Sequence, residues 1–252
     1  IGAGPAGMEC AIAARKRGHS VTVFDKGEAI GGNFRSYAGI DLANREDLLS
    51  VVSYYEVMAR KLGIEVKLNS EVNPKLMRSV LHQYDVAVVA AGARIDRNLL
   101  PPCEQPDLLV AARAAAAGRV KCGHRVVVLG AGKIGLTLAE SLQSRGHQVT
   151  IVEAEKRIAG DVQPSFKWRH TAWVEDLKIE CLTSTRAKNI ARGGVTVLDA
   201  KGEERFIAAD TVIGAMMRRG NQELFHELEW MVDELHGCGD ALVPRGLTQA
   251  IH

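Results

Sequence analysis

The sequence lacks the cysteine patterns of several specialised protein classes. No two of its five cysteines are spaced as C-x-x-C. This spacing argues against a zinc knuckle, an iron–sulfur cluster held within the chain, and a redox disulfide of the C-x-x-C type, so we expect no metal ligands. Isolated buried thiols are expected instead at the five positions, which are Cys10, Cys103, Cys122, Cys181 and Cys238.

The chain also has little net charge and no long apolar run. Its 32 basic residues nearly balance 30 acidic ones, for a net charge of +2. There is therefore no electrostatic case for a nucleic-acid or membrane partner. The longest apolar runs, such as residues 86–93, are far too short to cross a bilayer. No signal peptide is visible, so we expect a cytoplasmic protein.

The length and composition fit two globular domains. The 252 residues suffice for two cores, and 46% apolar and 25% charged residues are ordinary for a soluble protein. The chain opens at Ile1 without a methionine and ends at His252 inside an apparent helix. We expect it to be part of a longer polypeptide.

An internal repeat at an offset of 128 residues carries most of the information. Residues 2–7 (GAGPAG) align with residues 130–135 (GAGKIG), and residues 17–19 align with residues 145–147. The match ends in an acidic residue 23 positions after the first glycine of each copy, at Asp25 and Glu153.

Each copy has the sequence context of a dinucleotide-binding G-x-G-x-x-G loop. In the second copy an apolar strand, 125–129, precedes the loop and a helix, 134–145, follows it. The first glycine permits a tight turn, the second lets the pyrophosphate approach, and the third lets helix and strand pack closely. The helix N-terminus attracts the phosphates and the acid binds ribose hydroxyls. The expected binding residues are Gly2, Gly4, Pro5, Ala6, Gly7 and Asp25 in the first copy, and Gly130, Gly132, Lys133, Ile134, Gly135 and Glu153 in the second.

Glu153 bears on the choice of nicotinamide cofactor. Its carboxylate would repel the 2′-phosphate of NADPH, which usually meets an arginine. Lys156 and Arg157 lie close enough to keep NADPH open, but we favour NADH.

Periodicity predicts the remaining elements. We expect helices over 41–64, 74–82 and 165–178, strands over 64–68 and 85–91, and a β-meander over 179–213 with turns at residues 193–194 and 201–202. Trp168 and Trp173 are expected to pack in the helix 165–178, and His170 to have a structural role.

The sequence resembles the C-terminal region of the 2,4-dienoyl-CoA reductase, 2-enoate reductase and trimethylamine dehydrogenase family. The stretches that carry this resemblance are residues 1–7, 31–34 (GGNF), 90–93 (AAGA), 127–135 and 238–252, which begin CGDALVPR. The resemblance implies that Asp240 binds the ribityl chain of FAD. It adds Lys26, Gly32, Asn33, Ala91, Gly92, Gly239 and Thr248 to the cofactor-binding residues. Ala91 departs from the family's usual threonine, and Gly220 stands where a proline is common.

The predicted fold class is α/β, with two Rossmann-like domains of the pyridine nucleotide-disulfide reductase kind, the second inserted in the first. Residues 1–108 and 214–252 are expected to form an FAD-binding domain, 109–121 a linker, and 122–213 an NAD(P)-binding domain. Prolines 101, 102 and 106 mark the approach to that linker.

The predicted function is transfer of hydride from NADH to FAD, which needs no side-chain acid or base, so no catalytic residue is expected. The resemblance implies that an upstream barrel domain with FMN and a 4Fe–4S cluster then reduces an enoate or enoyl-CoA double bond. Two alternatives remain: a module that only binds ADP, as in trimethylamine dehydrogenase, and a stand-alone reductase of a separate electron carrier. The sequence leaves the final substrate open, and a homo-oligomer is compatible with it.

Overall fold

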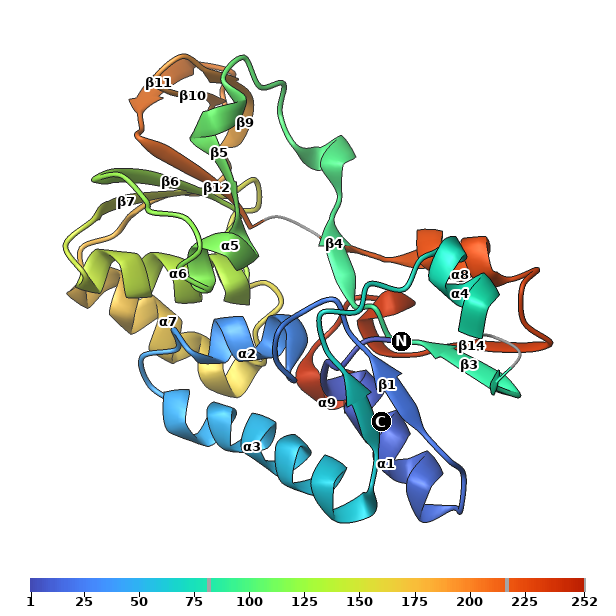
Figure 1. Cartoon of the computed structure of the whole chain (residues 1–252). Helices are drawn as coiled ribbons and strands as arrows, with labels where there is room; N and C mark the ends of the chain where they lie inside the picture. The colour runs from blue at the N-terminus through green and yellow to red at the C-terminus, as the bar shows by residue number, and fades with distance from the viewer. Residues whose placement is uncertain (81–82, 216–217, 252) are drawn as a thin grey trace. The chain divides into compact units, whose positions relative to one another are not determined.

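The computed structural model describes residues 1–80, 83–215 and 218–251, which form two compact units (Figure 1). Unit 1 is built from residues 1–38, 46–94 and 218 onward, and unit 2 from residues 39–45 and 95–215. Unit 2 is thus inserted in the sequence of unit 1. Each unit contains parallel strands and helices, so the predicted α/β fold class is confirmed.

The sheet of unit 1 contains two parallel pairs of strands. β1 pairs with β2, and β3 pairs with β14. The strands are short, and their bounds are Thr22–Phe24 (β1), Glu65–Lys67 (β2), Val86–Val89 (β3) and Glu234–Gly237 (β14).

The first two residues of the chain lie between these pairs. The Ile1 amine donates to the Val88 carbonyl at 2.7 Å, and the Ala90 amide donates to the Ile1 carbonyl at 2.8 Å. On the other side, the Gly2 amide donates to the Phe24 carbonyl at 2.7 Å. The N-terminal residues therefore occupy the central position of the sheet, from which a glycine loop can reach its carboxyl edge.

The helices α1 and α3 of unit 1 each bury one face. Met8 and Tyr55, on α1 and α3, lie in one apolar cluster with Val23 of β1. Among the described residues, no helix is long and apolar enough to cross a membrane. The helices are α1 (Pro5–Lys16), α2 (Gly32–Ala38), α3 (Arg45–Leu62), α4 (Pro74–Val80), α8 (Gln222–Leu228) and α9 (Leu247–Ile251).

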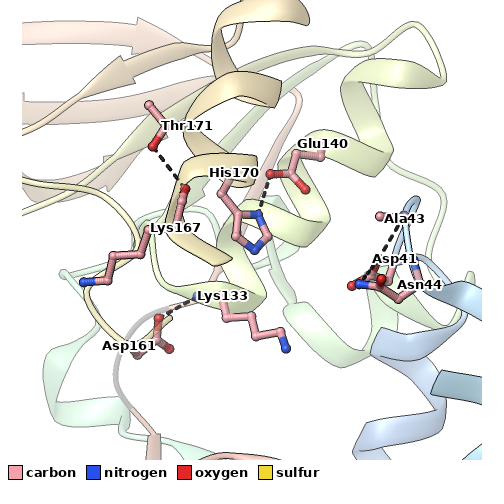
Figure 2. Close-up of polar contacts among 9 residues, drawn as sticks. All are labelled: Asp41, Ala43, Asn44, Lys133, Glu140, Asp161, Lys167, His170 and Thr171. Atoms are coloured by element: carbon pink, nitrogen blue, oxygen red, sulfur yellow. Dashed lines mark hydrogen bonds and ion pairs between the residues drawn. The ribbon is translucent and has the colours of Figure 1, made fainter. Parts of the chain in front are cut away.

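The helix predicted over 41–64 starts later than expected. Asp41 is buried, and its Oδ1 accepts the amides of Ala43 at 3.1 Å and Asn44 at 2.9 Å (Figure 2). These bonds form a turn that competes with helical hydrogen bonds, so α3 begins at Arg45.

Unit 2 contains a five-stranded parallel sheet in the order β5-β12-β6-β7-β8. The order reverses beside β6, and this is the switch point at which open α/β sheets bind ligands. The strands are β5 (Leu109–Ala111), β6 (Arg125–Leu129), β7 (Gln148–Val152), β8 (Glu180–Leu182) and β12 (Thr211–Gly214).

A three-stranded antiparallel sheet and several helices complete unit 2. The sheet has the order β11-β10-β9, with left-handed glycines at the predicted turns, so the β-meander is confirmed over residues 186–208. The two ends of the predicted range, 179–213, differ, because β8 and β12 pair in the parallel sheet instead. The further elements are α5 (Ala112–Ala116), α6 (Lys133–Ser144), α7 (Pro164–Asp176), β9 (Arg186–Ala191), β10 (Gly194–Leu198) and β11 (Glu204–Ala208). A short ladder joins β4 (Ala93–Ile95) to β13 (Arg218–Gly220).

Two further sequence expectations differ from the structure. The segment 109–121 was expected as a linker in which residues 111–117 could form a short helix, and α5 lies there, but the segment also contains β5, which pairs with β12 along the edge of the sheet. The expectation that both tryptophans of α7 pack is wrong for Trp168, which is 69% exposed. Trp168 and the buried His170 are two positions apart, which places them on different faces of the helix.

Candidate functional site

The first glycine loop follows the central extended segment of unit 1. Gly2 has φ +113°, and a Cβ there would lie 2.3 Å from the Ala90 carbonyl oxygen. A Cβ on Gly7 would lie 1.9 Å from the Gly2 carbonyl oxygen. The loop and α1 therefore approach as closely as backbone atoms allow, and both positions require glycine.

Gly4 is different because the space beside it is open. Its φ is −75°, and no described atom lies within 4 Å of a Cβ built there. It is the N-cap residue of α1 and has no side chain to bond the first helical amides, while Pro5 begins the helix. An N-terminus with free amides and open space in front of it fits a pyrophosphate.

The Asp25 carboxylate is held by its own loop. Oδ2 accepts the Ala3 amide at 2.6 Å, and Oδ1 accepts the Gly27 amide at 2.6 Å. Each carboxylate oxygen has a second lone pair, so Asp25 can fix the loop and still accept a ribose hydroxyl. Lys26 lies at an exposed position, with its Nζ 3.5 Å from Glu71.

The Gly31–Gly32 turn closes on the same loop. The Gly31 amide donates to the Ala3 carbonyl at 2.8 Å. A Cβ on Gly32, where φ is +54°, would lie 3.3 Å from the Gly4 Cα. The turn therefore places Asn33, in the first turn of α2, beside the open space at Gly4.

The C-terminal part of the chain returns to α1. Gly239 has φ +62°, and a Cβ there would lie 2.4 Å from the Ala6 Cβ. This close approach brings Asp240 near the first turn of α1. Thr248 is exposed on α9, a helix that also contacts α1. Residues predicted from opposite ends of the sequence are thus brought together in unit 1.

Asp240 has partners that the sequence did not predict. Its Oδ2 lies 3.1 Å from Arg218 Nη1, and its Oδ1 accepts the Arg245 amide at 3.0 Å. Gly220 lies against the same turn, because a Cβ there would be 2.3 Å from the Ala241 carbonyl oxygen. The Cβ of a proline at this position would meet the same oxygen.

The strand end at Ala91–Gly92 completes the predicted residues of unit 1. Gly92 has φ +70°, and its carbonyl accepts the Asn221 amide at 3.2 Å. Ala91 is half-buried and packs against an apolar cluster that contains Val89. The backbone here has the conformation for which glycine is suited.

The second glycine loop repeats the geometry of the first within unit 2. The Gly130 amide donates to the Val152 carbonyl at 2.8 Å, and Gly130 has φ +105°. A Cβ on Gly135 would lie 2.0 Å from the Gly130 carbonyl oxygen. Ile134 lies in the first turn of α6, between these glycines. The sequence repeat is therefore also a structural repeat.

Glu153 holds this loop as Asp25 holds the first. Its Oε2 accepts the Ala131 amide at 2.6 Å, and its Oε1 accepts the Glu155 amide at 2.8 Å. The second lone pairs of both oxygens are left for ribose hydroxyls.

The N-terminus of α6 differs from that of α1. The Lys133 amide donates to Asp161 Oδ1 at 2.7 Å (Figure 2). A Cβ on Gly132 would lie 2.9 Å and 3.0 Å from the two Asp161 carboxylate oxygens. Sequence reasoning missed Asp161, although it stands 128 residues after Asn33, the offset of the repeat.

A buried acid and base join α6 to α7. Glu140 Oε1 lies 2.7 Å from His170 Nδ1, and both side chains are 3% exposed (Figure 2). Burial raises the pKa of the Glu140 carboxyl. Because both side chains are buried between α6 and α7, the pair holds these two helices together, which agrees with the structural role expected for His170.

The expectation of isolated buried thiols is wrong for one pair of cysteines. Cys10 on α1 and Cys238, which precedes Gly239, are both half-buried and share a side-chain hydrogen bond. That bond is the main cause that lowers the pKa of Cys10 below its ordinary value and raises the pKa of Cys238. The two positions are far apart in the sequence, so no spacing motif reveals them.

Residues 1–238 match the family described as pyridine nucleotide-disulphide oxidoreductase. The chain belongs to this family. The match covers both glycine loops, the acidic residues Asp25 and Glu153, and most of each unit.

Similar curated proteins have reductase names. The chain is 30% identical over 285 aligned positions to a metal reductase of Desulforamulus reducens and 28% identical over 253 to a cinnamate reductase of Clostridium sporogenes. Both alignments cover 100% of this chain but 42% and 37% of the relatives. The chain thus spans about two-fifths of the length of these proteins.

Solved structures agree with this assignment. A 2-naphthoyl-CoA reductase bound to 2-naphthoyl-CoA matches with a TM-score of 0.90 and 31% identity, over 100% of this chain and 37% of the other. Histamine dehydrogenase from Rhizobium sp. 4-9 matches with a TM-score of 0.83 and 20% identity, over 99% of this chain and 41% of the other, which shows the shared fold.

These comparisons confirm three predictions: the resemblance to the enoate reductase family, the Rossmann-like fold, and the class of flavin- and nicotinamide-dependent oxidoreductase. The roles of individual residues and the boundaries of the cofactor-binding domains stay predictions.

Proposed function

We propose that this chain is the electron-entry part of a larger flavoenzyme, in which unit 1 binds FAD and unit 2 binds NADH. When bound, the two cofactors would supply the chemistry, which is hydride transfer from the nicotinamide to N5 of the flavin. The observation that carries the proposal is the structural repeat: both units contain a glycine loop whose acid is bonded to the loop's own amide.

The residues of unit 1 fit the parts of FAD. The open N-terminus of α1 at Gly4 suits the pyrophosphate, and the free lone pairs of Asp25 suit the adenosine ribose. Asp240 has lone pairs left for a ribityl hydroxyl, and Arg218 beside it balances its charge. These residues bind and orient the cofactor, and none is needed as an acid or base.

The residues of unit 2 favour NADH over NADPH. The Glu153 carboxylate is fixed at the end of β7 by two amides, so it cannot turn away easily from a 2′-phosphate. Lys156 and Arg157 lie on an exposed segment. Leaving charged groups poorly paired costs roughly 1–3 kcal/mol, or about ten- to a hundredfold in affinity.

The electrons have a proposed destination outside this chain. The relatives are more than twice as long as the matched region, which supports an additional domain. We assign to that domain an FMN and iron–sulfur barrel that reduces the double bond of an enoate or enoyl-CoA. The names cinnamate reductase and 2-naphthoyl-CoA reductase support an unsaturated acid or thioester as substrate.

Cofactor release tests the proposal against an ADP-binding module. The full-length protein is denatured, and the released nucleotides are separated by chromatography and quantified per chain. We expect one FAD per chain in addition to any FMN. Recovery of ADP without FAD would contradict the flavin assignment.

A further inference from the structure

The structural repeat extends beyond the glycine loops to the turns that follow them. The Gly31 amide donates to the Ala3 carbonyl at 2.8 Å, and the Ala159 amide donates to the Ala131 carbonyl at 2.8 Å. Donors and acceptors of the two bonds are related by the same offset of 128 residues. The turn therefore returns to its glycine loop in the same way in both units.

The residue two positions after each of these donors differs in charge. It is the neutral Asn33 in unit 1 and the acidic Asp161 in unit 2. The Asp161 carboxylate accepts the Lys133 amide at 2.7 Å and lies within 3.0 Å of the place a Cβ on Gly132 would take (Figure 2).

That position is the one a pyrophosphate would use. The second glycine of such a loop lets the phosphates approach, and the first amides of the helix donate to them. In unit 1 no described atom lies within 4 Å of a Cβ on the equivalent Gly4. In unit 2 a carboxylate already accepts one of these amides. An anionic pyrophosphate and this carboxylate cannot share the amide, because they carry charge of the same sign and compete for one proton.

We propose that Asp161 is an internal competitor for the nicotinamide nucleotide, which must displace its carboxylate from the N-terminus of α6 to bind. This inference rests on the proposed function of unit 2. Ala159 is 1% exposed and anchors the turn, whereas Asp161 is exposed. Displacement therefore requires the side chain to rotate into water and leaves the core in place.

The competition affects both redox states of the nucleotide, since NADH and NAD⁺ carry the same pyrophosphate. The cost of displacing the carboxylate weakens the binding of each. Its return to the Lys133 amide helps the oxidised nucleotide to leave, so Asp161 favours turnover over tight binding.

The test is the variant Asp161→Asn, which gives unit 2 the residue of unit 1. The amide oxygen still accepts the Lys133 amide, so the helix remains capped, but the negative charge is gone. NADH and inorganic pyrophosphate are each titrated by calorimetry into the flavin-loaded full-length protein, which is first reduced with dithionite under anaerobic conditions so that NADH binds without reducing the flavin. We expect both to bind about tenfold more tightly than to the unaltered protein. The matched control is Asp176→Asn, the same change at an exposed position at the end of α7, for which we expect unchanged affinities.

The outcomes separate this inference from the function on which it rests. If the unaltered protein binds NADH but Asp161→Asn binds it no more tightly, the competitor role is wrong and the proposed function stands. An equal gain in affinity in Asp176→Asn would also overturn the inference, because the loss of one negative charge anywhere on the protein would then explain the effect. If neither protein binds NADH, the proposed function and the inference both fail. Thermal unfolding without nucleotide checks that Asp161→Asn keeps its fold.

Discussion

Two alanine substitutions in the first glycine loop should separate binding from folding. In Gly4→Ala the added methyl group meets no described atom within 4 Å, and the φ of −75° suits alanine. In Gly7→Ala the methyl carbon would lie 1.9 Å from the Gly2 carbonyl oxygen. The two changes are chemically identical and lie three positions apart in the same loop.

The expected magnitudes follow from these distances. Gly4→Ala should change the free energy of unfolding by less than about 0.5 kcal/mol. Its methyl group would stand where the pyrophosphate approaches, and losing a charge-assisted hydrogen bond costs about 1.5–3 kcal/mol, or roughly ten- to a hundredfold in FAD affinity. Gly7→Ala forces the loop and α1 apart, which should destabilise the fold by about 1–3 kcal/mol or more.

Both quantities can be measured on the same preparations. Urea unfolding gives the free energy of unfolding, and denaturing release gives the FAD content per chain. We expect Gly4→Ala to unfold like the unaltered protein and to retain little FAD, and Gly7→Ala to unfold at lower urea. The reasoning would be refuted if Gly4→Ala retained a full complement of FAD, or if Gly7→Ala were as stable as the unaltered protein.

Three further predictions concern charge. Glu153→Ala should narrow the preference for NADH over NADPH, measured as the rates at which the two nucleotides reduce the flavin in a stopped-flow instrument. If NADPH reduced the unaltered protein as fast as NADH does, the assignment of NADH as the cofactor would be refuted. Burial raises the Glu140 pKa above its ordinary 4.5, so the stability it contributes is complete below that pH and is lost as the pH rises through the raised value. We therefore expect the free energy of unfolding of Glu140→Gln, measured in urea, to rise relative to that of the unaltered protein as the pH increases. A difference between the two free energies that does not change with pH would contradict this. Alkylation of Cys10 should show a midpoint below that of an ordinary thiol, as its lowered pKa implies. Cys238→Ala should raise that midpoint, and a midpoint that does not move would show that the hydrogen bond is not the cause of the lowered pKa.

The features that could be predicted from the sequence are those that a short local pattern specifies. The two glycine loops, their acids and the β-meander each have a signature within a short stretch, and the repeat supplied the context that a single G-x-G-x-x-G lacks. The nested order of the units also followed from the sequence, because Gly4 and Asp240 can serve one cofactor only if the chain between them forms a separate unit.

What the sequence could not predict depends on partners distant along the chain. Arg218 pairs with Asp240 within the C-terminal segment, and Cys10 pairs with Cys238 because that segment returns to α1. Helical periodicity did not reveal which side of α7 packs against the rest of the unit, so Trp168 was wrongly expected to be packed. Asp161 had a signal in the repeat, but only the geometry shows its carboxylate bonded to α6.

Anaerobic reduction by NADH tests the central claim most directly. The full-length protein with bound FAD is mixed with one equivalent of NADH, and the visible flavin absorbance is followed in a stopped-flow instrument. We predict rapid loss of the absorbance of oxidised FAD together with oxidation of the nucleotide, and a much smaller loss in Gly4→Ala, which should lack FAD. Persistence of the oxidised flavin spectrum after NADH addition would contradict the account.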